Sequence, residues 1–257
     1  MSGVWGISMV RDEADVIEAT VRHMASQVDR LIVADNGSVD GTTEILHALA
    51  DELPLHVVDD PEVGYYQSRK ITVLAARAGH EGAAWVVPFD ADEAWYSPHG
   101  RIADVLAEHH LASIAAAELY DHVPTGQDTA DGDHLDRITW RRREAAALPK
   151  VAVRPYPRVN IHQGNHGADF GGRVDGLLVV RHYPYRSTEQ FVSKARNGAA
   201  AYAATDLPYS EGQHWRDYGA LLDGGGPEVL HDVFRRHFWV HDPTARPDLI
   251  CDPCPRA

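Results

Sequence analysis

Short apolar runs alternate with longer, partly polar segments between residues 4 and 89. The runs are too short for helices and predict buried strands at residues 4–10, 31–34, 55–58 and 85–89. The segments between them have helical periodicity and predict helices over residues 12–22, from residue 40 onward, and over residues 66–78. Such alternation is typical of an α/β fold, in which a mostly parallel sheet has helices on both faces and its strand ends share one edge.

The regular alternation ends near residue 98. Further helices are expected over residues 102–111, 187–204 and 228–239, and short strands over residues 113–119, 138–143, 150–154, 159–161 and 177–181. Residues 125–136 are rich in Asp and Gly and predict a mobile loop, and residues 162–167 predict a second loop punctuated by glycine. We expect a single domain over residues 1–242 and a proline-rich tail over residues 243–257.

Composition narrows the classes of protein that fit. A formal net charge of −14 argues against a sequence-independent grip on phosphate backbones, so no nucleic-acid partner is expected. No apolar run approaches the ~20 residues of a transmembrane helix, and no signal peptide is visible, so we expect a cytoplasmic protein. Cys251 and Cys254 supply half a zinc site, and a disulfide or two thiols is the favoured interpretation. The 16 histidines include no HExxH or comparable pair, which disfavours a zinc hydrolase.

Three carboxylates, Asp90, Asp92 and Glu93, directly follow the fourth predicted strand. Asp90 and Asp92 lie two positions apart, so they point the same way in an extended chain. A solvated acidic turn is the simplest explanation of the cluster by itself. However, Asp12 and Asp35 also follow predicted strands, and a parallel sheet brings such strand ends to one edge, where ligands bind. Oxygen ligands of this kind suit Mg²⁺ or Mn²⁺ carried with a phosphate-bearing ligand.

Three segments together resemble one protein family. Asp90-Ala91-Asp92 after an apolar strand resembles the DxD motif of GT-A glycosyltransferases, in particular of the family 2-like group. Val4–Glu13 and Leu31–Thr42 resemble the first strand of that group and its second strand with the following turn. The resemblance extends over about residues 4–200 and implies a Rossmann-like GT-A fold. Residues 1–97 would then form the nucleotide-binding half and residues 98–242 the acceptor-binding half.

The resemblance implies a nucleotide-sugar site at the strand ends, with Asp92 as a metal ligand. Asp35 would accept a hydrogen bond from the base, although a plain turn former is the alternative. Arg69 would contact the base or a phosphate, although a surface position on an amphipathic helix explains it equally well. The donor contacts that the resemblance implies in this half are Val10, Arg11, Glu13, Asp35, Arg69, Asp90 and Ala91.

The second half must supply a general base, which an inverting glycosyltransferase uses to deprotonate the acceptor hydroxyl. Relatives often carry a His followed directly by Glu in this region, whereas here Gly167 follows His166. Asp169 is therefore the first candidate for the base and Asp175 the second. His166 is the third candidate, because imidazole titrates near neutral pH.

Residues 182–187 resemble an HYxxRS segment found in part of the same group. The resemblance implies that His182 completes the metal shell or holds the phosphates, with His166 as the competing metal ligand. Arg186 and Lys194 would pair with the charge of a diphosphate. The alternative is a helix start with a packed aromatic cluster.

These implications together predict transfer of a sugar from a UDP-, GDP- or TDP-sugar to a hydroxyl acceptor of unknown type, with inversion. The expected cofactor is Mn²⁺ or Mg²⁺, which would neutralise charge on the leaving diphosphate. A nucleotidyltransferase is one alternative, disfavoured because no glycine-rich basic loop follows the first strand. A non-catalytic nucleotide-sugar-binding module is the other, because the expected His-Glu pair is missing.

Overall fold

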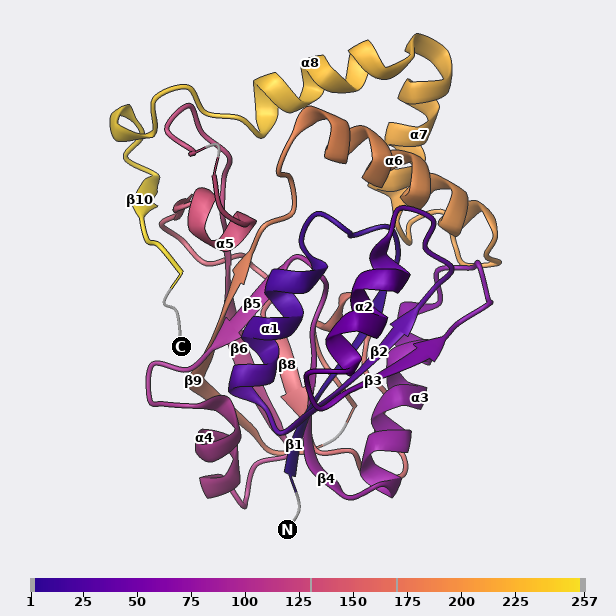
Figure 1. Cartoon of the computed structure of the whole chain (residues 1–257), viewed down its shortest axis with the longest axis vertical. Coiled ribbons are helices and arrows are strands. Elements are labelled where there is room, and N and C mark those ends of the chain that lie inside the picture. The colour runs from indigo at the N-terminus through magenta and orange to yellow at the C-terminus, as the bar shows by residue number, and fades with distance from the viewer. Residues whose placement is uncertain (1–2, 130, 170, 255–257) are drawn as a thin grey trace.

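A computed structural model of the chain describes residues 3–129, 131–169 and 171–254. Its centre is an eight-stranded sheet with the strand order β3-β2-β1-β4-β8-β6-β9-β5 (Figure 1). The strands of this sheet are β1 (Gly3–Val10), β2 (Arg30–Asp35), β3 (Leu55–Asp59), β4 (Ala83–Pro88), β5 (Glu93–Tyr96), β6 (Ile114–Asp121), β8 (Lys150–Val153) and β9 (Arg173–His182). Neighbours among β1 to β4 pair in parallel, whereas β8 is antiparallel to both β4 and β6. The predicted α/β class with a mostly parallel sheet is therefore confirmed for the first half, and the second half makes the sheet mixed.

Helices cover both faces of this sheet, and a further group of helices lies beyond the ends of its central strands (Figure 1). The helices are α1 (Ile17–Gln27), α2 (Thr42–Ala50), α3 (Gln67–His80), α4 (Ile102–Glu108), α5 (His134–Arg137), α6 (Thr188–Ala203), α7 (Gln213–Gly225) and α8 (Pro227–His237). Two short 3-10 turns add Gln163–Asn165 and Pro243–Ala245. In Figure 1, α6, α7 and α8 lie together at the top, above the ends of the central strands.

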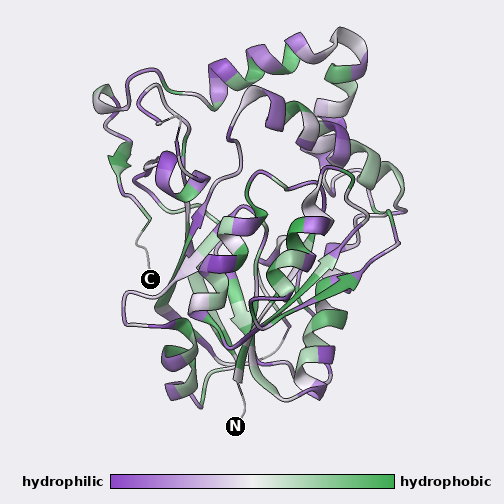
Figure 2. Ribbon diagram, in the orientation of Figure 1, coloured by the Kyte–Doolittle hydropathy of each residue, from purple (hydrophilic) through white to green (hydrophobic). Residues whose placement is uncertain are grey.

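The continuous apolar run of β4 is explained by burial on both faces of the sheet. Trp85, Val87 and Phe89 belong to one hydrophobic core, while the intervening Val86 belongs to the core on the opposite face. Several of the central strands are accordingly largely apolar in Figure 2, whereas β9 and the helices are mixed. A strand packed on both sides is held firmly, which fixes the position of the residues at its carboxyl end.

Several element boundaries differ from those predicted. Helix α1 begins at Ile17 rather than at residue 12, because Asp12 has a left-handed φ of 54°. In addition, the backbone amides of Asp12 and Glu13 donate hydrogen bonds to the hydroxyls of Ser38 and Thr42. Strand β5 and helix α7 are present although the sequence pattern did not predict them. Residues 159–161 form no named strand, and Ile161 makes only an isolated bridge. Within the segment predicted as a mobile loop, residues 134–137 form α5, and residue 130 lies outside the described residues.

The segment predicted as a tail packs against the domain as far as it is described. Strand β10 (Leu249–Cys251) pairs with β7 (Trp140–Arg142) in a separate two-stranded sheet. The carboxylate of Asp252 accepts hydrogen bonds from Arg141 and Arg181 at 2.5 and 2.8 Å. Cys254 is buried, and no disulfide joins it to Cys251. Among the described residues, no helix has both the length and the apolar character needed to cross a membrane.

Candidate functional site

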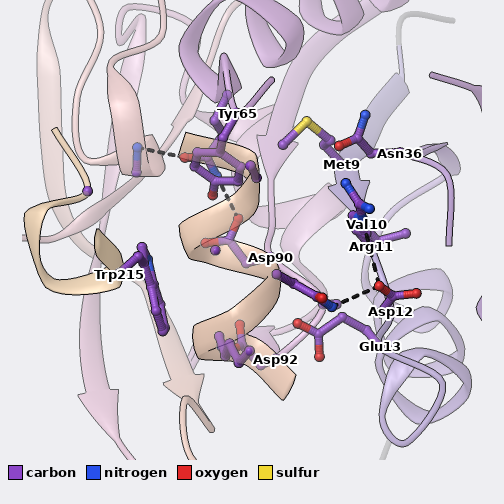
Figure 3. Close-up of a pocket in the computed structure, with 18 of the residues that line it drawn as sticks. Met9, Val10, Arg11, Asp12, Glu13, Asn36, Tyr65, Asp90, Asp92 and Trp215 are labelled. Atoms are coloured by element: carbon purple, nitrogen blue, oxygen red, sulfur yellow. Dashed lines mark hydrogen bonds and ion pairs between the residues drawn. The ribbon is translucent and has the colours of Figure 1, made fainter. Parts of the chain in front are cut away.

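A cavity of about 1140 Å³ opens at the carboxyl edge of the sheet, beneath helices α6 and α7 (Figure 3). One side consists of residues at the ends of β1 and β4 and at the start of β8, here called the sheet wall. The other side consists of residues 187–202 and 210–215 of the α6–α7 segment, here called the helical wall. The loop of residues 162–166 lines the cavity as well. Each residue predicted from the sequence to bind a ligand or to act in catalysis can therefore be checked for whether it lines this cavity.

The sheet wall is built on a buried lysine that the sequence did not single out. Because β8 runs antiparallel to β4, its first residue, Lys150, lies at the edge where β4 ends. The Lys150 ammonium is 2.7 Å from carboxylate oxygens of both Asp90 and Glu93. Asp90 also accepts hydrogen bonds from Gln67 at 3.0 Å and Asn165 at 3.2 Å. Asp90 is thus oriented from three directions, and its position does not depend on a ligand.

Burial and pairing act against each other in this network. Glu93 is fully buried, and burial raises the pKa of its carboxyl despite the opposing effect of Lys150. Burial alone would lower the pKa of Lys150, but Asp90 and Glu93 outweigh it and raise the pKa well above its usual value. Lys150 is therefore a permanent cation in the wall, and removing it would leave carboxylates without compensation.

Asp92 lies among three basic side chains. It forms an ion pair with Lys194 of α6, and its carboxylate lies 3.8 Å from His182 and 3.9 Å from Arg186. Burial opposes ionisation, yet Lys194, His182 and Arg186 together hold the pKa of Asp92 well below its usual range. Asp92 is accordingly ionised at neutral pH, as a ligand for a cation must be.

The geometry around His182 fits a metal-binding histidine. Its Nδ1 lies 2.8 Å from a carboxylate oxygen of Asp121, so Nδ1 donates to Asp121 and Nε2 faces Asp92. Burial lowers the pKa of His182, but Asp92 and Asp121 outweigh it and raise the pKa, which favours the charged ring while Asp92 has no metal. No group of three or more His, Cys, Asp or Glu placed to hold a metal occurs among the described residues. Asp92 and His182 supply one carboxylate and one imidazole close enough to share a cation, with the remaining ligands to come from outside the chain.

The loop after β1 lines the cavity as predicted. Val10, Arg11 and Glu13 are all part of its surface, together with Ala91 between the two aspartates. Arg186, in contrast, is not part of that surface: it donates to Glu13 at 2.7 Å and to Asp15 at 2.8 Å, from behind the wall. The structure therefore gives Arg186 the task of holding this loop, and its guanidinium is already committed to carboxylates of the chain.

Two other residues predicted as donor contacts lie outside the cavity. The Asp35 carboxylate accepts hydrogen bonds from the amide and hydroxyl of Ser38, at 3.1 and 2.6 Å, and from the hydroxyl of Thr43. It thus closes the turn after β2, and its neighbour Asn36 reaches the cavity instead. Arg69 is exposed and pairs with Glu62 at 2.5 Å on the outer surface of α3. The structure does not place Asp35 or Arg69 with the other residues predicted to bind the nucleotide-sugar.

The three candidates for a general base are placed very differently. Asp169 is exposed and bonds to His162 and Asn160, and Asp175 is exposed and pairs with Arg173; neither lines the cavity. His166 does line it. Its Nδ1 lies 2.9 Å from the carbonyl oxygen of Pro149. A carbonyl only accepts, so Nδ1 carries the proton and Nε2 keeps its lone pair. Burial lowers the pKa of His166, which favours the neutral ring.

Four of the cavity residues that sequence reasoning missed are the most informative. They are Lys150, Tyr65, Gln67 and Trp215. The pattern gave some signal for two of them. Gln67 begins a predicted helix, and Lys150 begins a predicted strand, but the direction of that strand was not readable. Trp215 lies on α7, where glycines at both ends obscured the helical spacing of the aromatic residues.

Comparison with known proteins gives one match to a family model. The model described as glycosyl transferase family 2 matches residues 7–145, which is more than half of the chain. No curated protein sequence gives a significant match.

Solved structures with a similar backbone include S. aureus TarS 1–349 in complex with UDP-GlcNAc. It is 14% identical, with a TM-score of 0.46, over 87% of this chain and 73% of that chain. Another is GalNAc-T7 with UDP, GalNAc and Mn²⁺, which is 13% identical with a TM-score of 0.41, over 93% of this chain and 58% of that chain.

Proposed function

The chain belongs to glycosyl transferase family 2, and from this membership we propose that its cavity binds a nucleoside diphosphate-sugar and transfers the sugar to a hydroxyl. The observation that carries the proposal is the placement of Asp90 and Asp92. Both follow a doubly buried strand, both face one cavity, and each is paired with a different lysine from a distant part of the chain. Carboxylates held this way beside ammonium groups suit a ligand that combines hydroxyls with phosphates.

The donor's nucleoside is proposed to lie along the ends of β1 and β2. Val10, Arg11 and Asn36 form this part of the cavity surface and offer apolar area, a cation and an amide. Asp90 would accept hydrogen bonds from ribose hydroxyls, because its carboxylate is already oriented by Lys150 and Gln67. We expect a UDP-, GDP- or TDP-sugar.

The diphosphate is proposed to lie between Asp92 and Lys194. When bound there by Asp92 and His182, Mn²⁺ or Mg²⁺ would neutralise charge that develops on the leaving diphosphate. Lys194 now compensates Asp92. A cation at Asp92 would release the Lys194 ammonium toward the phosphates, which is a displacement of a side chain end rather than of the backbone.

His166 is proposed as the general base instead of Asp169 or Asp175. Its Nε2 would take the acceptor's hydroxyl proton while the acceptor oxygen attacks the anomeric carbon and the bond to the diphosphate breaks. Such a direct displacement inverts the configuration at that carbon. The hydrogen bond to the carbonyl of Pro149 fixes the required tautomer and holds the ring against the cavity.

The test is release of nucleoside diphosphate from UDP-, GDP- and TDP-sugars in the presence of Mn²⁺, with water as the default acceptor. We expect slow release from one of these donors by the wild type and none by Asp92→Asn. Binding of a donor without any release would favour the non-catalytic module, and release of pyrophosphate from a nucleoside triphosphate would favour a nucleotidyltransferase. Either result contradicts the proposal.

A further inference from the structure

Trp215 lines a part of the cavity that the proposed nucleotide position does not reach. In Figure 3 it lies on the opposite side from Arg11 and Asn36, with Asp90 and Asp92 between them. Its ring is partly exposed and forms part of the cavity surface. The indole therefore faces the space beyond the proposed phosphate position, and away from the proposed nucleoside position.

A series of contacts connects the segment that carries Trp215 to the loop that carries His166. The side chain of Gln163, three residues before His166, donates to the Tyr202 hydroxyl at 3.3 Å. The Tyr202 ring in turn packs on Gly212, where an added Cβ would lie only 2.2 Å from ring atoms. Gly212 begins the first turn of α7, and its carbonyl accepts from the amide of Trp215 at 3.0 Å. The aromatic end and the proposed base are thus parts of one connected structure.

The position of the Trp215 indole requires a glycine inside α6, which lowers the stability of that helix. Gly198 lies inside α6, where glycine costs about 1 kcal/mol relative to alanine. A Cβ at this position would lie 2.9 to 3.2 Å from Cγ, Cδ2 and Cβ of Trp215. The absence of a side chain lets the indole lie against the backbone of α6 while its exposed part faces the cavity. Both Gly198 and Trp215 line the cavity.

The surroundings of the ring favour a ligand with a polar rim and an apolar face. Ser210, Glu211 and His214 line the same end of the cavity and offer hydroxyl, carboxylate and imidazole groups. The whole cavity, at about 1140 Å³, exceeds the range of roughly 300–1000 Å³ that is usual for one small ligand. There is space for a second molecule beside the donor.

We propose that Trp215 is the stacking platform for a pyranose ring of the acceptor, which makes the acceptor a saccharide. The C–H groups of one pyranose face carry partial positive charge and pack on the indole face, while the ring hydroxyls bond to Ser210, Glu211 and His214. This inference rests on the proposed function, since it assigns the acceptor of that reaction.

The test uses the indole N–H signals of the protein in two-dimensional ¹H–¹⁵N NMR spectra. The chain has six tryptophans, so the signal that Trp215→Phe removes is that of Trp215. UDP-, GDP- and TDP-sugars are titrated first with Mg²⁺, which is diamagnetic, so that the donor's own sugar is in place, and methyl glycosides of common pyranoses are then added. Glycerol serves as the hydroxyl-bearing control without a ring. We expect the Trp215 signal to stay in place with nucleotide-sugar and to move with at least one glycoside, but not with glycerol.

Two variants separate the platform from a general effect on the fold. Trp215→Ala should weaken glycoside binding by about tenfold or more, measured by saturation transfer to the glycoside. Trp239→Ala is the matched control, because Trp239 is an exposed tryptophan that does not line the cavity, and it should change nothing. Gly198→Ala should reproduce the loss while Trp215 is still present, since the added methyl displaces the indole.

The outcomes also separate this inference from the proposed function. Nucleotide-sugar binding without any glycoside effect on Trp215 overturns the platform alone. Movement of the Trp215 signal with nucleotide-sugar, and none on adding glycoside, assigns the ring to the donor and likewise overturns it. If no nucleotide-sugar binds, the proposed function fails, and a glycoside that still moves Trp215 supports a saccharide site by itself.

Discussion

The two walls of the cavity hold their polar groups in different ways. On the sheet wall, Lys150, Asp90 and Glu93 neutralise one another in a buried network that is complete without a ligand. On the helical wall, His214 is exposed and Trp215 is partly exposed to the cavity. The first arrangement is part of what holds the fold together, whereas the second contributes contact surface. Substitutions within the Lys150–Asp90–Glu93 network should therefore reduce stability, and those at His214 or Trp215 should mainly reduce binding.

The largest expected effect belongs to the loop between the two walls. His166→Ala should lower kcat by ~10²–10⁴-fold, the usual contribution of general base catalysis, while nucleotide affinity is unchanged. Steady-state release of nucleoside diphosphate measures the first quantity and calorimetry the second. Asp169→Asn is the control and should retain full activity, because Asp169 lies outside the cavity. If Asp169→Asn is inactive and His166→Ala is not, the base is Asp169.

Lys150→Met tests whether the sheet wall supports the fold. Removing one partner leaves Glu93 buried without its counter-charge, so the free energy of unfolding should fall by about 3–5 kcal/mol, measured by urea denaturation. Adding Glu93→Gln should restore part of the loss, because the uncompensated charge is then gone. Arg77→Ala, which breaks an exposed pair with Glu81, is the control and should leave the midpoint unchanged. Equal effects of Lys150→Met and Arg77→Ala would contradict the difference between the walls.

Asp35→Ala tests whether Asp35 stabilises the turn after β2 or binds the base of the nucleotide. Its loss leaves the hydroxyls of Ser38 and Thr43 without their acceptor, so unfolding should become easier by about 1–3 kcal/mol. Nucleotide affinity should change less. An unchanged stability together with an affinity loss of about 10- to 150-fold would return Asp35 to the role of base ligand.

Arg69→Ala should have the smallest effect. The Arg69 side chain is exposed and pairs with Glu62 on the outer surface, so both nucleotide affinity and stability should stay within experimental error. A clear loss of affinity by calorimetry would show that Arg69 moves into the cavity when the donor binds.

The parallel half of the fold was predictable because its signals are local. Each apolar run from β1 to β4 is bounded by turn residues, and each following helix has its own periodicity, so Asp90 and Asp92 could be placed at a sheet edge. The mixed half depends on pairings between distant residues. Lys150 reaches Asp90 across 60 positions of sequence, and no local pattern gives the direction of β8.

The structure brings together some of the candidate residues as expected, and others not. Asp92, His182 and Lys194 come together as expected, from three separate segments. Asp35 also ends a strand, but its carboxylate turns back to Ser38 and Thr43 rather than toward the cavity. Which way a side chain turns at a strand end depends on the turn that follows, and the sequence leaves that choice open.

The central claim is that Asp92 lies where a metal and a nucleoside diphosphate bind together. Calorimetric titration of UDP, GDP and TDP, with and without Mn²⁺, into wild type and Asp92→Asn tests it most directly. We expect one nucleotide to bind the wild type more tightly with Mn²⁺, and this gain to disappear in Asp92→Asn. Equal binding by both proteins, or no binding of any of the three nucleotides, would contradict the account.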